Sequence, residues 1–469
     1  MPDVPEMPEM PEVTESGEPE DPGRPDASRQ VGLVLDLCLR VGEILLSSGA
    51  GAADVSVTMQ AVAAHYGLRQ PEVDVTFTSL AMSHQARPED SPVMAIRTVK
   101  LREIDYEDLT QVDHLVRCIL SSQCTLPEAR VRLNRIVSSG HQRRRWAVTA
   151  AWGLMCAGVA VQLGGTPSVA AVAVVAAVTI DRLQYRLTRR RLPFFYRQLA
   201  GGAVATFLAA AATAAGVPGE VSLIVSANIV MLLAGVGFMG AIQDALSGFY
   251  ITGGARILEA MLATAGIIAG ASAGLTLAAT LGVDLGRYVP GRAEGWDAIP
   301  LTAAGAAVAA AAFAYASYAP RRILLPIAVI GGVAMAIQQA VEAQGFDRPW
   351  ASGIAAFFVG LVSYAVSGKV GVPPLVTVVS AVVPMLPGLL IYRGLSLLAL
   401  GGQSSSPGLV ALVTAASVAI ALAAGVLLGE YVAQPLRREA RRLESRLAGP
   451  RLVGPLVIRS RRRPPADPS

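Results

Sequence analysis

Charged residues are scarce in this sequence. Asp, Glu, Lys and Arg make up 16% of its 469 residues, whereas an average soluble domain holds about 25%. Hydrophobic residues make up 53%, and the mean hydropathy is +0.49. This composition excludes an ordinary soluble globular protein and predicts a membrane protein.

The few charges are also segregated along the chain. The first thirty residues are acidic, while arginines cluster around residues 143–145, 182–191 and 437–463. The formal net charge of +4 therefore describes no single surface, and no nucleic-acid partner is expected. Arginine clusters beside apolar segments commonly face lipid head groups, so the expected partner is the bilayer.

Cysteine and histidine are rare, with four residues of each. The histidines are not grouped, and no two cysteines have C-x-x-C spacing, which zinc sites and redox motifs commonly use. We therefore expect reduced, buried thiols, no disulfide framework, no metal and no cofactor. The cysteines are Cys38, Cys118, Cys124 and Cys156.

The sequence lacks a phosphate-binding loop at its one similar segment, and the N-terminal domain lacks hydrolase motifs. The segment SGKV at Ser367 lacks the upstream glycine and the following Ser or Thr of a phosphate-binding loop, so ATP-driven pumping is not expected. Residues 30–142 contain no G-x-S-x-G and no H-E-x-x-H. His65, His84 and His114 are scattered there and are expected to be packed or surface residues, so the chain is not expected to be an enzyme.

The N-terminal third divides into a tail and a small domain. Residues 1–29 repeat Pro-Glu-Met and have little to bury, so we expect an acidic, disordered tail. Residues 30–142 combine helical spacing with strand-like alternation at 72–83 and 93–99, which predicts an α+β domain. No basic and apolar secretory signal is visible at the N-terminus, so this domain is expected in the cytoplasm.

From Trp146 onward, apolar segments have the length of about 20 residues that crosses a bilayer core. Ten such segments, with the N-terminal domain inside, put the arginine-rich connections on the cytoplasmic side. The sequence thus predicts a multi-pass protein of the cytoplasmic (inner) membrane with both termini in the cytoplasm. The expected spans lie near residues 146–163, 166–183, 195–216, 221–242, 256–282, 299–318, 322–341, 350–367, 372–392 and 407–430.

A repeat relates the first five spans to the last five, about 153 residues later. VSANIVMLLAGVGF at Val225–Phe238 parallels VSAVVPMLPGLLIY at Val379–Tyr392. Because five is odd, the second unit should be inverted, which is the architecture of many secondary transporters. The predicted fold is a polytopic α-helical membrane protein with a 5+5 inverted repeat, with membrane units 143–283 and 299–434 and a basic cytoplasmic tail 435–469.

Each parallel segment carries a break of small residues, Ala234-Gly235 in one and Pro387-Gly388 in the other. In the ninth span the two prolines and the glycine should unwind the helix and free backbone groups to hold a polar solute. Glu259 is the candidate for carrying a coupling proton, because ionisable residues inside spans are costly and commonly functional. The residues assigned to the transport pathway are Asn228, Gly235, Asp244, Arg256, Glu259, Pro384, Pro387, Gly388, Tyr392 and Arg393.

Several longer segments resemble a known family. VGEILLSSGAGAADVSVTMQAVAAHYGL, followed by VDVTFTSLAMS, resembles the N-terminal domain of the threonine/serine exporter family. LLAGVGFMGAIQDALSGFYITGGARILEA is similar to that family's first membrane motif, and VVPMLPGLLIYRGL to its second. The resemblance covers residues 30–434, in the single-chain form with both halves fused. One departure is Ala234-Gly235, where the family's first motif usually reads Pro-Gly.

The resemblance implies export of small hydrophilic amino acids, threonine and serine, by proton antiport. Two other functions stay open at this stage. One is an exporter or channel for another solute such as a dicarboxylate, for which Arg256 and Arg393 would supply fixed cations. The other is a hydrolase formed by the N-terminal domain and anchored to the membrane. The sequence also leaves open whether the protein is a homo-oligomer.

Overall fold

The computed structural model describes residues 24–99, 104–141, 143–218, 221–232, 234–282, 295–400 and 404–447. Within these limits the chain forms two compact units, residues 1–140 and 141–469.

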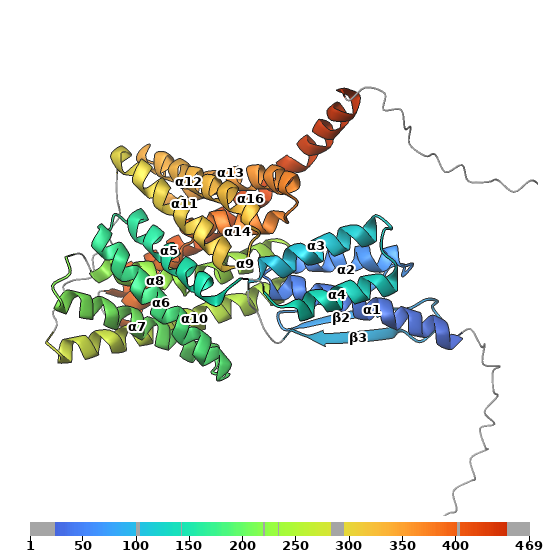
Figure 1. Ribbon diagram of the computed structural model, residues 1–469, viewed down its shortest axis with the longest axis horizontal. Coiled ribbons are helices and arrows are strands. Elements are labelled where there is room, and N and C mark those ends of the chain that lie inside the picture. The colour runs from blue at the N-terminus through green and yellow to red at the C-terminus, as the bar shows by residue number, and fades with distance from the viewer. Residues whose placement is uncertain are drawn as a thin grey trace, which may run out of the picture. The chain divides into compact units, whose positions relative to one another are not determined.

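The first unit combines helices with an antiparallel sheet of strand order β1-β2-β3. Val75 of β1 lies opposite Leu80 of β2, and Met82 of β2 lies opposite Ala95 of β3. Leu80 and Met82 are buried, and helices α1 and α2 pack on the sheet (Figure 1). The elements are α1 (Arg24–Ser47), α2 (Ala52–His65), β1 (Glu72–Val75), β2 (Ser79–His84), β3 (Val93–Thr98), α3 (Tyr106–Leu120) and α4 (Leu126–Ser139).

The structure changes the predicted limits of both tails. Helix α1 begins at Arg24, so residues 24–29 are helical rather than disordered. A proline at the second position of α1 suits a helix start, because its missing N–H would have no intrahelical acceptor there. At the other end α16 continues to Leu447, through the first part of the predicted basic tail. Residues 1–23 and 448–469 of the predicted tails lie outside the described chain.

The expectation of four reduced cysteines is wrong for two of them. Cys118 and Cys124 form a disulfide, because the turn between α3 and α4 brings their Cα atoms within 5.7 Å. A guanidinium nitrogen of Arg132 lies 3.2 and 3.1 Å from the two sulfur atoms. Cys38 and Cys156 are free and buried, as expected. Burial raises the pKa of the Cys38 thiol to about 12.

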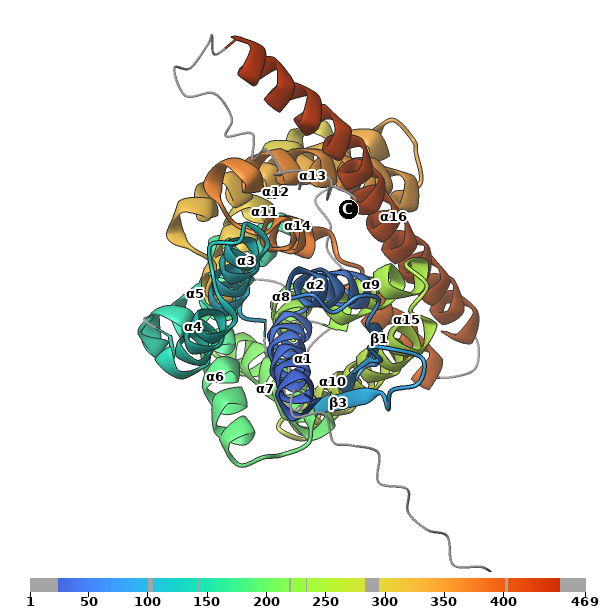
Figure 2. The same ribbon diagram turned by 90° about the vertical axis from the view of Figure 1, so that its right-hand side faces the viewer.

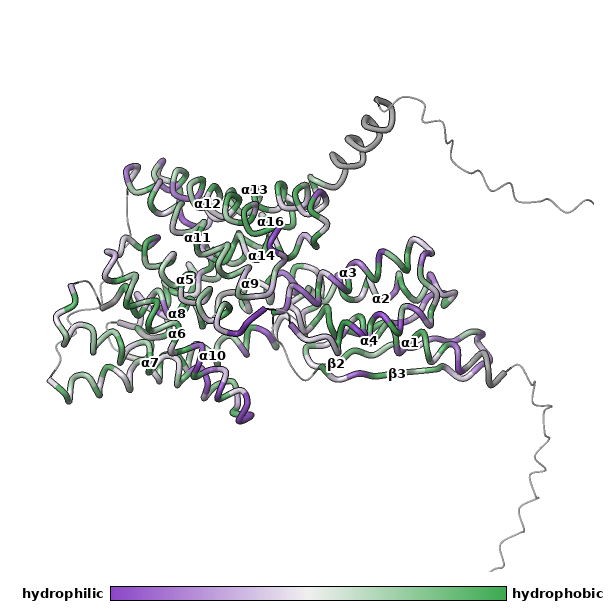
Figure 3. Tube along the Cα trace, viewed as in Figure 1, coloured by the Kyte–Doolittle hydropathy of each residue, from purple (hydrophilic) through white to green (hydrophobic). Residues whose placement is uncertain are grey.

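All regular elements among the described residues of the second unit are helices, and hydrophobic residues predominate along them (Figure 3). Its α-helices are α5 (Arg145–Gln162), α6 (Pro167–Arg189), α7 (Phe194–Ala214), α8 (Val221–Met231), α9 (Ala234–Leu246), α10 (Tyr250–Thr280), α11 (Ile299–Ala316), α12 (Arg321–Ala343), α13 (Arg348–Val370), α14 (Pro374–Val382), α15 (Gly388–Leu400) and α16 (Ser405–Leu447). Two short 3-10 helices are η1 (Trp296–Ala298) and η2 (Val383–Met385).

Among the described residues, six helices are long and apolar enough to cross a membrane, or seven if one bent pair counts as a span. The chain is therefore a polytopic helical membrane protein. The six are α6, α10, α11 with η1, α12, α13 and the Ser405–Ala433 part of α16, and the bent pair joins α14 and η2 to α15. The predicted spans that correspond to α5, α7 and the α8–α9 pair do not belong to this set, so the count of ten stays a prediction.

Helix α6, which corresponds to the second predicted span, runs through Asp181 to Arg189. The Asp181 carboxylate accepts hydrogen bonds from an Arg145 guanidinium nitrogen at 2.6 Å and from the Thr149 hydroxyl at 2.7 Å. Both partners belong to α5. A buried charge that is paired and hydrogen-bonded in this way is tolerated inside a helical bundle.

Glycines let two helix pairs of the second unit pack backbone against backbone. A Cβ atom added at Gly270 of α10 would overlap the carbonyl oxygen of Leu199 on α7. On another helix pair, a Cβ atom at Gly360 of α13 would overlap the carbonyl oxygen of Val426 on α16. Small residues at such contacts are the usual means of close helix association in membranes.

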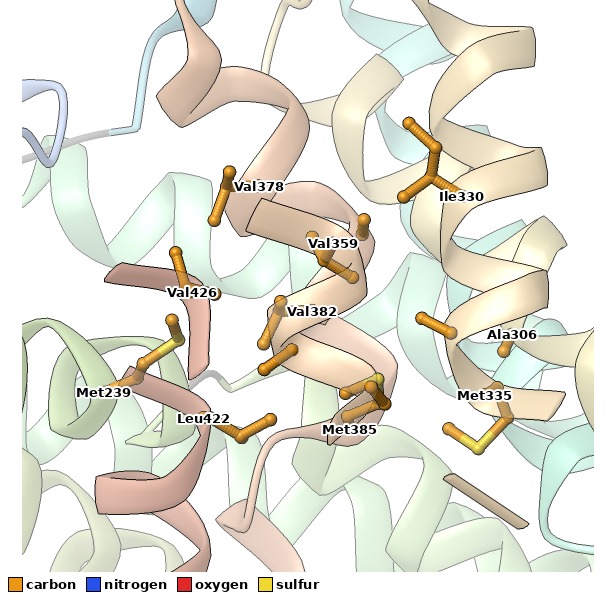
Figure 4. Close-up of a cluster of buried hydrophobic side chains, with 14 of the residues drawn as sticks. Met239, Ala306, Ile330, Met335, Val359, Val378, Val382, Met385, Leu422 and Val426 are labelled. Carbon is orange, nitrogen blue, oxygen red and sulfur yellow. The ribbon is translucent and has the colours of Figure 1, made fainter. Parts of the chain in front are cut away.

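A cluster of buried hydrophobic side chains surrounds α14 and η2 (Figure 4). Val378 and Val382 of α14 and Met385 of η2 belong to this cluster with residues of α9, α11, α12, α13 and α16. Figure 4 shows Met239 of α9 on the side of Leu422 and Val426. Protein side chains, rather than lipid, therefore cover the end of α14.

Replacing Gly270 with alanine should destabilise the second unit, because the added methyl group has no room beside Leu199. Overpacking of this kind costs about 1–3 kcal/mol. Thermal unfolding of the purified protein in detergent measures the loss as a lower apparent Tm. Gly254→Ala on the same helix is the control, since nothing lies within 4 Å of its added Cβ. Equal Tm values for the two variants would contradict the packing argument.

Thiol labelling should distinguish the two pairs of cysteines. In the native, non-reduced protein a maleimide should label none of the four cysteines, because two form a disulfide and the other two are buried. After mild reduction, Cys118, which is partly exposed, should react, while the buried Cys38 and Cys156 react only after denaturation. Mass spectrometry of the digested protein locates each label. Labelling of Cys118 without reduction would show that the disulfide is absent.

Candidate functional site

The ninth predicted span is broken, as its sequence predicts. Helix α14 passes into η2, Leu386 adopts an extended conformation with φ −62° and ψ 142°, and α15 starts at Gly388. The two parts meet at an angle of 45°. Pro384 and Pro387 cause the break, because neither has an N–H group to donate to the carbonyl four residues earlier.

A glutamine side chain compensates for the backbone freed at this break. The Nε2 group of Gln162, the last residue of α5, donates to the carbonyl oxygen of Pro384 at 2.8 Å. The other amide atom of Gln162, Oε1, is buried and has no partner within the described protein. Ser380, one turn before Pro384, is fully buried and its hydroxyl also lacks a partner. Each such unpaired group costs about 1–3 kcal/mol.

A second break separates α8 from α9, between Met231 and Ala234. The Leu232 carbonyl there accepts a hydrogen bond from Nε2 of Gln198 on α7 at 3.4 Å. Gln198 is 5% exposed, and its Oε1 atom has no partner within the described protein. Asn228, one turn before the break, is fully buried and donates to the Ile224 carbonyl at 2.8 Å, while its Oδ1 atom lacks a partner.

The two breaks therefore contain the same three kinds of polar group. Each has a backbone carbonyl at the end of a half-helix, a glutamine amide that donates to it, and a buried polar side chain one turn earlier. Gly235 lies in the first turn of α9 and Gly388 is the first residue of α15. The glycines thus start the second half-helix at each break.

Asp244 and Arg256 form a buried ion pair where α9 turns into α10. Their carboxylate oxygen and guanidinium nitrogen are 2.9 Å apart, and the side chains are 1% and 8% exposed. A Cβ atom added at Gly240 would lie 3.1 Å from that guanidinium group, so Gly240 leaves room for the arginine. Each charge neutralises the other, which explains how both are tolerated in the interior.

The remaining predicted residues lie on α10 and α15. Arg393 is exposed, Tyr392 is 9% exposed, and Glu259 is partly buried with no ion-pair partner in the described part of the chain. The predicted set thus separates into residues at the breaks, one ion pair and three other positions on α10 and α15.

Sequence reasoning missed Gln162, Gln198 and Ser380. The available signal was a single uncharged polar residue in an apolar span, which is weaker than a charge. Gln162 and Gln198 also lie near the ends of their predicted spans, where a polar residue is ordinary.

Comparison with known proteins gives matches over most of the chain. The family model described as "Putative threonine/serine exporter" matches residues 36–278, and the model described as "Threonine/Serine exporter, ThrE" matches residues 302–432. A probable threonine/serine exporter of Mycobacterium tuberculosis is 35% identical over 435 residues, which cover 90% of this chain and 82% of the relative. A threonine/serine exporter of Corynebacterium glutamicum is 32% identical over 419 residues, covering 88% and 85%. No solved structure matches.

Removing one member of the buried ion pair should destabilise the protein strongly. Asp244→Leu or Arg256→Leu leaves an unpaired charge in the interior, at a cost of about 3–5 kcal/mol. The double variant should unfold closer to the wild-type temperature than either single variant does, because it leaves no unpaired charge. Apparent Tm in detergent measures all three. Arg393→Leu, at an exposed position, is the control and should change little; additive losses in the double variant would refute the coupling.

Proposed function

Because the chain belongs to the threonine/serine exporter family, we propose that it exports threonine and serine across the cytoplasmic membrane as a secondary transporter driven by proton antiport. The observation that carries the proposal beyond the family is the pair of broken helices, whose buried polar atoms lack partners. In secondary transporters, substrates bind at such discontinuous helices.

The proposed architecture is a 5+5 inverted repeat of ten spans, in which α8–α9 and α14–α15 are the two broken spans. Its first support is the spacing of the helices. Ile299 follows Arg145 by 154 residues and Ala316 follows Gln162 by 154, so both bounds of α11 correspond to those of α5. Both bounds of α12 follow those of α6 by the same interval.

The broken spans follow the same interval. Gly388, the start of α15, lies 154 residues after Ala234, the start of α9, and both helices contain 13 residues. The sequence-based estimate of about 153 residues is therefore one residue short for the helix bounds.

Helix packing supports the repeat independently. Helix α5 packs on α6 and α8, as α11 packs on α12 and α14. Helix α7 packs on α10, as α13 packs on α16. Across the two halves, α15 contacts α10 and α9 contacts α16; Figure 2 shows α15 beside α9 and α10. Such exchanged contacts are expected of two units related by a two-fold axis.

We further propose that both termini and residues 30–142 are cytoplasmic, with the N-terminal unit gating or assembling the transporter. The support is the positive-inside rule. Arg189, Arg190 and Arg191 between α6 and α7, and Arg321 and Arg322 at the start of α12, then lie on the cytoplasmic side.

A dicarboxylate substrate is less well supported than an amino acid. Its two negative charges would need fixed cations, and the two candidates were Arg256 and Arg393. Arg256 is neutralised by Asp244, and Arg393 is exposed. The anchored-hydrolase function also lacks support, since the relatives are exporters. For proton coupling, Glu259 remains the proposed carrier, because Asp244 is already paired with a cation.

Transport by inside-out vesicles tests the proposal. With an acidic interior, vesicles that contain the protein should accumulate labelled threonine and serine, and a protonophore should abolish the accumulation. Pro387→Ala should slow uptake by restoring helix at the break, and Glu259→Gln should abolish its dependence on the gradient. Vesicles without the protein are the control.

The outcomes separate the parts of the proposal. Threonine uptake that ignores the gradient would refute antiport but leave export intact. Uptake of succinate without threonine would favour the dicarboxylate function, and the absence of any uptake would refute transport of these solutes.

A further inference from the structure

We infer that Gln162 binds the substrate at the break between α14 and α15, with its Oε1 atom accepting a hydrogen bond from the α-ammonium group of the amino acid. The inference rests on the proposed function and names the group that recognises the substrate class.

The first argument is that only one of the two polar atoms of the Gln162 amide has a hydrogen-bond partner. Its donor, Nε2, is used by the Pro384 carbonyl at 2.8 Å, which fixes the orientation of the side chain at the break. Its acceptor, Oε1, is left buried without a partner in the described protein. An oriented acceptor that lacks a donor matches a ligand that brings one.

The second argument is the chemistry of the polar atoms that α12 and α14 contribute near the break. The Ser380 hydroxyl, one turn before Pro384, is buried and unpaired as well. The Met335 sulfur lies 3.9 Å from Nε2 of Gln162. An amide oxygen, a hydroxyl and a thioether carry no net charge, so these groups suit a small zwitterion better than a ligand with net charge.

The third argument is the start of α15. Ile391 makes the first backbone hydrogen bond of this helix, to the Pro387 carbonyl. The N–H groups of Gly388, Leu389 and Leu390 precede it and have no intrahelical acceptor. Such N–H groups bind carboxylates. An amino acid at this break therefore meets acceptors for its ammonium group and donors for its carboxylate.

The test compares threonine with 3-hydroxybutyrate, which is threonine without its amino group. In inside-out vesicles, both compete with labelled threonine, and the ratio of their inhibition constants measures the contribution of the ammonium group. Gln162→Met keeps the size of the side chain and removes the acceptor. The ratio should fall by about tenfold or more in this variant, as expected for the loss of a hydrogen bond to a charged group.

Gln184→Met is the matched control. Gln184 also donates from Nε2 to a backbone carbonyl, that of Arg197, at 2.9 Å. Its loss removes the same kind of bond between α6 and α7 rather than at the α14–α15 break, so the ratio should stay at the wild-type value. Ser380→Ala provides a second variant at the site, in case Gln162→Met folds poorly, and should lower the ratio in the same direction.

The outcomes distinguish this inference from its premise. If wild-type vesicles take up no threonine, the proposed function is wrong and the inference falls with it. If the wild type transports threonine and Gln162→Met and Ser380→Ala keep the wild-type ratio, only the inference is wrong. An unchanged ratio with uptake that requires sodium would assign the buried oxygen atoms to a cation and also overturn it.

Discussion

In a bilayer core no water reaches the backbone, so each N–H and C=O group there needs a partner within the protein. A continuous helix meets this requirement by itself, whereas a broken helix does not. The chain breaks one helix with Pro384 and Pro387 and provides Gln162 from another helix to pair with the freed carbonyl. The break is then covered by side chains of the surrounding helices (Figure 4). Polar backbone at that depth is possible only because the protein encloses it.

Close helix packing makes this enclosure possible. Gly270 and Gly360 allow the backbones of α7 and α10, and of α13 and α16, to touch. Three of these helices also carry buried polar residues, such as Gln198 of α7, Arg256 of α10 and Ser363 of α13. The broken helices pack against them, since α15 contacts α10 and α16, and α9 contacts α16. The close-packed helices thus both support the broken helices and carry some of the buried polar groups.

The parts of this arrangement that depend on local sequence could be predicted. Prolines lack an N–H wherever they lie, so the break at Pro387 and the start of α15 at Gly388 follow from the residues themselves. The alternation in residues 72–83 also indicates strand, although the structure divides it into a hairpin. Buried ionisable residues such as Asp244 attract attention because charge is rare in apolar spans.

The contacts between distant segments could not be predicted in this way. Gln162 and Pro384 are 222 residues apart, and nothing near either residue indicates that they meet. The disulfide was missed for a related reason: a six-residue separation is no known motif, and only the turn between α3 and α4 brings Cys118 to Cys124. The ten spans are predicted from the length and hydrophobicity of each segment. Helices such as α5 do not pass this test by themselves, so their assignment as spans depends on the helices that pack against them.

The buried ion pair and the two breaks share one property, which is that neither carries a net charge. Arg256 is held by Asp244, so the described interior presents neither of them as a net charge to a solute. The atoms left without partners at the breaks are amide and hydroxyl oxygens, which are neutral. Threonine and serine have no net charge at neutral pH but expose an ammonium group, a hydroxyl and a carboxylate. A neutral surface with hydrogen-bonding groups can match them without adding the desolvation cost of a fixed charge. In the proposed transport site, substrate selection would therefore depend on hydrogen-bond geometry, while the ion pair joins α9 to α10.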